Sequence, residues 1–203
     1  MAQSGHEHLD SQELLHLALD ASRRHKHEDA ITLLKRALAI APDDARLHYL
    51  LGAEHAQIGL YDRAAEEMQN AVHLDPKLET AHFQLGLLHV TSGRVEQAAE
   101  AWKPLDKLGP DHPLYLFKTG LLHLSKDEFS ECERNLRRGI GANKANPALN
   151  NDMQRILREI ENQAPGEKSE TSAAAEISRP KTTTPKHVLL SAYKRNRPDD
   201  KES

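Results

Sequence analysis

Residues 45–76 read ARLHYLLGAEHAQIGLYDRAAEEMQNAVHLDP, and residues 79–110 read ETAHFQLGLLHVTSGRVEQAAEAWKPLDKLGP. The two stretches share their small, apolar and proline positions when one is shifted by 34 residues along the chain. The columns on this period are Ala18, Gly52, Gly86 and Gly120; Leu17, Leu51 and Leu85; Ala30, Ala64 and Ala98; and Pro42, Pro76 and Pro110. A period of this length is typical of stacked helix-turn-helix repeats. Such arrays usually bind other molecules and rarely catalyse reactions.

The pattern predicts four repeats over residues 11–44, 45–78, 79–112 and 113–146, with residues 1–9 as a flexible N-terminus. Asp10 and Glu13 match a capping box for the first helix. A further helix is expected over residues 147–162, with one polar side that suits the end of an array. Residues 10–163 would thus form one array. Pro104 falls inside the second helix of the third repeat, so we expect that helix to bend or break near Lys103.

The periodicity stops at residue 164, where a stretch rich in Ser, Thr, Ala and Pro begins. Residues 164–203 are expected to be disordered. They contain eight Lys and Arg residues and six Asp and Glu residues, which gives this segment a net charge of +2. The net charge of the whole chain is −4. Within them, residues 186–197 contain an apolar and basic segment, whose apolar side chains are Val188, Leu189, Leu190 and Tyr193. We expect this segment to dock reversibly on the array or on a partner, with a solvated tail as the alternative.

The repeated columns resemble the tetratricopeptide repeat family over about residues 11–144. Its Leu-Gly pair is matched by Leu51-Gly52 and Leu85-Gly86, and its second-helix alanine by the column that includes Ala64. The resemblance implies an all-α fold, a right-handed superhelical solenoid. Two columns depart from the family pattern. The opening aromatic column reads Leu14, His48, His82 and Leu116, and the tyrosine column reads Ala21, His55, His89 and His123.

The resemblance also implies that the first helix of each repeat lines a concave surface. The side chains expected there form a mostly apolar trough, and exposed apolar patches usually mark interaction sites. They are Leu15, Leu19, Tyr49, Leu50, Ala53, Phe83, Gln84, Leu87, Val90, Phe117, Lys118, Leu121 and Leu124. The alternative is that some of them pack inside the solenoid and the trough is narrower. Lys118 is its one basic residue, which argues against the family's clamp for acidic C-terminal peptides.

Metal binding by the histidine columns is the weaker interpretation, because His55, His89 and His123 come with no recurring Cys or carboxylate. The alternative is that each ring packs in place of an aromatic residue. Cys132 suits a core position better than a nucleophile. No motif for catalysis or for a cofactor is present, and neither nucleic-acid binding nor a membrane span is indicated. One cysteine and a polar N-terminus indicate a cytoplasmic protein.

The sequence therefore predicts a non-enzymatic, cytoplasmic protein-interaction module, an adaptor or chaperone that holds an apolar or amphipathic segment of another protein in its trough. The alternative is a structural scaffold that self-associates through the same trough or through the Pro104 region, as a homo-oligomer. Neither hypothesis identifies the partner.

Overall fold

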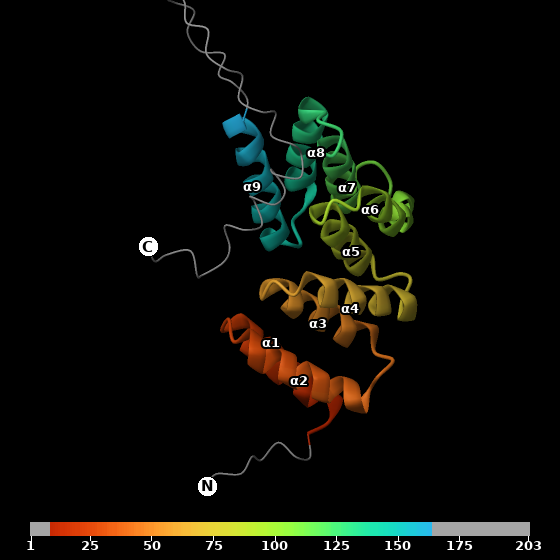
Figure 1. Cartoon of the computed structure of the whole chain (residues 1–203), viewed down its shortest axis with the longest axis vertical. Helices are drawn as coiled ribbons and strands as arrows, with labels where there is room; N and C mark the ends of the chain where they lie inside the picture. Colours follow the sequence, from red (N-terminus) through yellow and green to blue (C-terminus); the bar gives the residue numbers. More distant parts are fainter. Residues whose placement is uncertain (1–8, 164–203) are drawn as a thin grey trace, which may run out of the picture. The chain divides into compact units, whose positions relative to one another are not determined.

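The computed structural model describes residues 9–163 of the chain, and over this range it is entirely helical, as the sequence predicts (Figure 1). Helices of successive repeats begin at intervals of 34 residues, at residues 11, 45, 79 and 113 and again at 27, 61, 95 and 129. The elements are α1 (Ser11–Arg23), α2 (His27–Ile40), α3 (Ala45–Gln57), α4 (Tyr61–Leu74), α5 (Glu79–Thr91), α6 (Val95–Trp102), the 3₁₀ helix η1 (Lys103–Leu108), α7 (Pro113–Leu124), α8 (Phe129–Ala142) and α9 (Pro147–Gln163).

The described chain divides into two compact units. Unit 1 holds residues 9–89 and 100–104, and unit 2 holds residues 90–99 and 105–163. Helices α5 and α6 contribute residues to both units.

Unit 1 is built from antiparallel hairpins in which α1 packs on α2 and α3 on α4, while α2 also contacts α3. One core cluster joins these first three helices, with Leu14, Leu34 and Leu51 nearly inaccessible to solvent. A second cluster joins α4 to α5 through residues such as Met68 and Leu85. Each hairpin has a face that it cannot bury alone, so burial depends on the next repeat.

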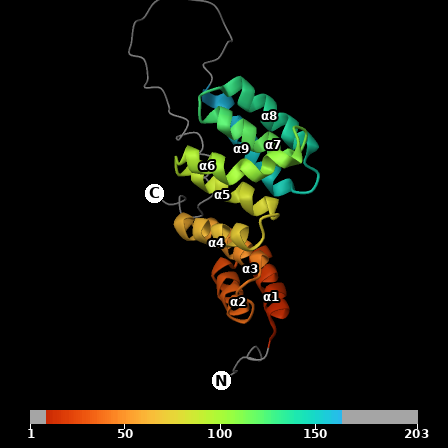
Figure 2. The ribbon, with the colours of Figure 1, turned by 90° about the vertical axis from the view of Figure 1, so that its right-hand side faces the viewer.

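Unit 2 pairs α7 with α8 and α8 with α9, as both views show (Figure 2). An asparagine cluster shapes the turn between α8 and α9, where the closing proline of the other repeats is replaced by Lys144. The Asn143 side chain donates to Asn150 Oδ1 at 2.8 Å, and the Asn150 side chain donates back to the Asn143 carbonyl at 2.9 Å. Asn146 caps α9 by accepting from the Leu149 backbone amide.

The turn inside each hairpin uses one left-handed residue on the same 34-residue period: His25, Gly59, Gly93 and Asp127. Their φ angles are +58°, +79°, +75° and +62°. In three of these turns, the following amide donates to a carbonyl five residues back, for example Leu60 to His55 at 2.9 Å. Glycine adopts this left-handed conformation without a steric cost. In His25 and Asp127 the Cβ atom makes the same conformation sterically unfavourable.

Pro104 breaks the second helix of the third repeat, as predicted. Helix α6 ends at Trp102, and the chain continues from Lys103 as the 3₁₀ helix η1. Proline has no amide hydrogen to donate, and it disfavours the α conformation at the residue before it. The break places Asp106 on η1, where it contacts Lys118.

Candidate functional site

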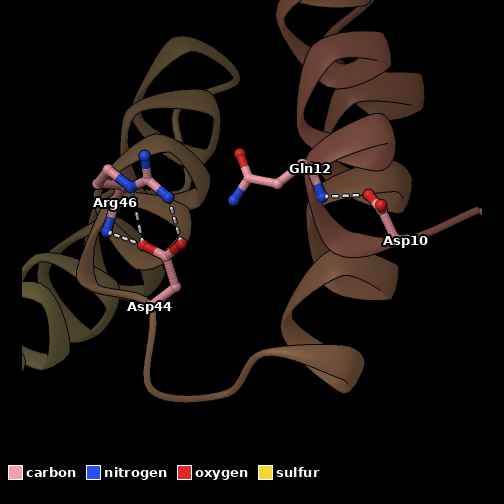
Figure 3. A network of polar contacts seen from close by, with 4 residues as sticks. All are labelled: Asp10, Gln12, Asp44 and Arg46. Atoms are coloured by element: carbon pink, nitrogen blue, oxygen red, sulfur yellow. Dashed lines mark hydrogen bonds and ion pairs between the residues drawn. The ribbon is translucent and has the colours of Figure 1, made fainter.

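Acidic residues cap the N-termini of the first helices of repeats 1 and 2 (Figure 3). The Asp10 side chain accepts from the amides of Gln12 and Glu13 at 2.8 Å, and Glu13 bonds back to the Asp10 amide, which completes the predicted capping box. Asp44 accepts from the Arg46 amide and from two nitrogens of its guanidinium. The Arg46 hydrogen bond lowers the pKa of the Asp44 carboxyl. Arg46 is thereby committed to its own helix cap.

Eight of the side chains expected to line the trough are buried, so they belong to the interior and do not line an open surface. They are Leu15, Phe83, Leu87, Val90, Phe117, Lys118, Leu121 and Leu124. The physical reason is visible in α5 and α7, which are apolar on nearly all sides, and helices of that kind are buried all round.

Phe83 and Phe117 illustrate how these positions are filled. The Phe83 ring stacks on Trp102 at a centroid distance of 6.0 Å, inside unit 1. The Phe117 ring occupies the space above Gly139 in unit 2, where an added Cβ would lie 2.5 Å from it. Both rings are structural.

Lys118 is buried by two contacts within unit 2. Its ammonium group pairs with Asp106 Oδ1 at 2.5 Å and lies 5.0 Å from the centroid of the Tyr115 ring. The lysine therefore ties η1 to α7.

Five of the expected residues remain at least partly accessible, and all of them lie in unit 1; together they are called the unit 1 face. They are Leu19 on α1, Tyr49, Leu50 and Ala53 on α3, and Gln84 on α5. Leu19 is 37% exposed, whereas Leu87, its counterpart two repeats later, is 1% exposed. Tyr49 packs against the core of α4 and α5 and bonds to Thr80, and burial raises the pKa of its phenol. Tyr49 and Leu50 are thus held by packing against the core, while Leu19 remains exposed.

Sequence reasoning missed a polar cluster that joins repeats 1 and 2. Glu54 is 6% exposed and accepts from Ser22 Oγ at 2.5 Å and from His27 Nδ1 at 2.8 Å. The same position holds Asp20 in repeat 1 but Leu88 and Leu122 in repeats 3 and 4, so the change from acidic to apolar residues along this column was the available signal. A buried carboxylate with two donors holds the junction in register.

The histidine columns make hydrogen bonds instead of gathering around one point. His48 contacts Glu67 and His123 contacts Glu128, at 2.6 and 2.5 Å. Within residues 9–163, no group of three His, Cys, Asp or Glu side chains could hold a metal ion. Cys132 is buried, and desolvation raises the pKa of its thiol to about 12. A thiol in that environment is a weak nucleophile.

The tail segment with Val188, Leu189, Leu190 and Tyr193 lies outside the described residues, so its docking stays a prediction. None of the helices between residues 9 and 163 has the length and apolar character that crossing a bilayer requires.

The family model of the tetratricopeptide repeat matches residues 15–79 and 83–131, more than half of the chain. No curated protein matches the sequence significantly. Among solved structures, a crystal structure of MamA is 23% identical, with a TM-score of 0.56 over 65% of this chain and 77% of that one. MamA 41-end from Desulfovibrio magneticus RS-1 is 15% identical, with a TM-score of 0.58 over 74% of this chain and 83% of that one. These structural likenesses concern the fold alone. On the repeats that it carries, this chain belongs to the tetratricopeptide repeat family.

Proposed function

We propose that this chain is a non-enzymatic protein-interaction module, and that its unit 1 face receives an apolar or amphipathic segment of a partner protein. Membership of a family of interaction repeats supports the general role. The proposal places the contact on Leu19, Tyr49 and Ala53, on the first helices of repeats 1 and 2. An adaptor or chaperone that holds a short apolar segment would work in this way.

The observation that carries the proposal is the exposure of Leu19. In the third repeat the equivalent leucine is part of the interior, but on α1 it keeps 37% of its surface in water. The base beneath the face is rigid, since Leu50 packs against the core of α1, α2 and α3, and Tyr49 packs against that of α4 and α5. An accessible leucine beside packed apolar neighbours offers an anchor point for an apolar segment of a partner.

The experiment compares capture of partner proteins by the full chain and by Leu19→Glu. The matched control is Leu60→Glu, because Leu60 is 40% exposed but lies at the N-cap of α4, on neither of the helices that the proposal assigns to the contact. Both substitutions are at exposed positions, so both variants should fold with wild-type stability to within about 0.5 kcal/mol. Partners bound by the wild type and by Leu60→Glu should be lost from Leu19→Glu. Equal capture by the two variants would contradict the proposal.

A further inference from the structure

Four exposed side chains form one stripe along α1, called the α1 stripe. They are Gln12, His16, Leu19 and Arg23. Their separations of four, three and four residues place them on one side of the helix. The stripe contains Leu19, on which the proposed function depends, and it ends at an arginine. It therefore presents an apolar side chain and a cation one helical turn apart.

The Arg23 guanidinium is held beside Leu19 by a hydrogen bond to the backbone. Its Nε atom donates to the Leu19 carbonyl oxygen at 3.3 Å. The Nη groups remain available as donors on this exposed side chain. A planar guanidinium in this position suits a carboxylate, which accepts two parallel hydrogen bonds from it.

The cations that follow Arg23 in the turn between α1 and α2 have acidic neighbours. Arg24 pairs with Asp20 at 2.9 Å, and Lys26 lies 3.9 Å from Asp29. Within residues 9–163, Arg23 forms no such ion pair. Its charge is thus the one in this turn that is not balanced by a carboxylate of the described chain.

The positions of α3 and α5 that correspond to the α1 stripe contain no carboxylate either. They hold Arg46, Leu50, Ala53 and Gln57 on α3, and Thr80 and Gln84 on the part of α5 that belongs to unit 1. Figure 3 shows the Gln12 side chain pointing from α1 toward Arg46 on α3, in agreement with one shared surface. Arg46 is paired with Asp44. The whole chain has more acidic than basic residues, 31 against 27, so this surface departs from its average composition.

We propose that the unit 1 face selects partner segments in which carboxylates flank the apolar side chains, with an Asp or Glu of the partner bound to the Arg23 guanidinium. The proposal rests on the proposed function, in which the apolar part of the segment contacts Leu19. The apolar contact contributes affinity, and Arg23 contributes selectivity, because it attracts acidic segments and repels basic ones. The carboxylate belongs to a side chain, so a free C-terminus of the partner is not required.

The same charge argument disfavours one segment of this chain as the occupant of the unit 1 face. Residues 186–197 contain four Lys and Arg residues and no Asp or Glu. Their apolar side chains would suit Leu19, but their positive charges would be repelled by Arg23. A peptide of residues 186–197 is therefore a natural probe of the opposite charge.

The test measures the affinity of the full-length chain for two synthetic amphipathic peptides with blocked termini, by isothermal titration calorimetry. Both peptides have leucines at the same helical positions, and the flanking positions hold glutamate in one and lysine in the other. The wild type should bind the glutamate peptide more tightly than the lysine peptide or the peptide of residues 186–197. This preference should shrink as salt is added. Equal affinities for the glutamate and lysine peptides at low salt would overturn the proposal.

Substitutions of two neighbouring arginines locate the carboxylate contact. Arg23→Gln should weaken binding of the glutamate peptide about two- to fivefold, and Arg23→Glu should reverse the preference in favour of the lysine peptide. Arg24→Gln is the matched control, because it removes the same charge from a side chain that pairs with Asp20. It should weaken binding less than Arg23→Gln does. Equal losses in the two glutamine variants would overturn the proposal, since they would indicate attraction by the charge of the whole turn.

A neutral substitution at Leu19 separates this proposal from the proposed function. Leu19→Gln should weaken binding of both synthetic peptides, because both lose the same apolar contact. If it does so while the wild type binds the two peptides equally, the contact at Leu19 stands and the selection by charge is wrong. If Leu19→Gln binds both peptides as tightly as the wild type does, the proposed function fails, and this proposal fails with it.

Discussion

The indole Nε1 of Trp102 donates a hydrogen bond of 2.9 Å to the carbonyl oxygen of Phe83, and the two rings stack with an interplanar angle of 24°. The bond is possible because Gly86, one helical turn further along α5, has no side chain. A Cβ at that position would lie 2.1 Å from Trp102 Nε1. The repeated glycine column is therefore a requirement of packing between the helices of a hairpin.

Substitution of Gly86 by alanine should displace Trp102 and leave its N–H buried without an acceptor. We expect a loss of about 2–4 kcal/mol in the free energy of unfolding. Gly52→Ala should cost less, because its Cβ meets flexible Met68 atoms at 3.2 Å and a carbonyl oxygen at 3.0 Å. Gly141→Ala in α8 is the control, since nothing lies within 4 Å; it should be neutral or gain up to about 1 kcal/mol. Urea unfolding of the three variants tests this order.

Replacement of His25 by glycine should stabilise the protein by about 0.5 kcal/mol. A left-handed conformation costs a residue with a Cβ atom about 1–2 kcal/mol, and this cost disappears in glycine. Part of the gain is lost because glycine makes the unfolded chain more flexible. The reverse change, Gly59→Ala in the equivalent turn at φ +79°, should destabilise by about 1–2 kcal/mol. Thermal midpoints should move in opposite directions for the two variants. A lower midpoint for His25→Gly would mean that the histidine side chain has a stabilising role of its own.

His55 should make the protein acid-sensitive. It is 3% exposed, its Nδ1 atom has no hydrogen-bond partner, and burial followed by the charge of Lys35 lowers its pKa. The neutral form is therefore favoured in the folded chain. Stability is full above about pH 6.5, the ordinary value for histidine, and is lost as the pH falls from there toward the lowered pKa.

The replacement His55→Phe should flatten the decline in stability between about pH 6.5 and 5, while the exposed control His73→Gln should keep it. The measurement is the urea midpoint across this range. A steep acid decline that persists in His55→Phe would assign the sensitivity to another group.

The ion pair between Lys118 and Asp106 should have a structural role, and replacing Asp106 should cost more stability than replacing Lys118. Asp106→Ala leaves the ammonium group of a nearly buried lysine without its carboxylate, at a cost of about 1–2 kcal/mol in unfolding free energy. Lys118→Met removes the buried charge and keeps the apolar contacts, so it should cost less than about 1 kcal/mol. Partner binding should be the same for Lys118→Met as for the wild type. If Lys118→Met folded normally but no longer bound the partner, Lys118 would be part of the binding site after all.

The sequence predicts the repeats well because their period is set by close packing, as at Gly86, and by chain geometry, as at Pro104. The left-handed turn residues also leave a trace in the sequence, because two of them, Gly59 and Gly93, are glycines on the 34-residue period. The sequence did not show which of the expected trough residues remain exposed. Leu19 and Leu87 have the same residue type and repeat position, but one is exposed and the other buried. That difference depends on what packs over each helix, which a repeat pattern does not encode.

The most direct test of the proposed function is site-specific photocrosslinking in extracts of the source organism. A photoreactive phenylalanine analogue would replace Leu19, Ala53 or, as the control, Leu60 in the full chain. The account predicts that positions 19 and 53 crosslink to the same partner polypeptide through an apolar segment, and that position 60 does not. Crosslinks from position 60 alone, or from 19 and 53 only to a second copy of this chain, would contradict it.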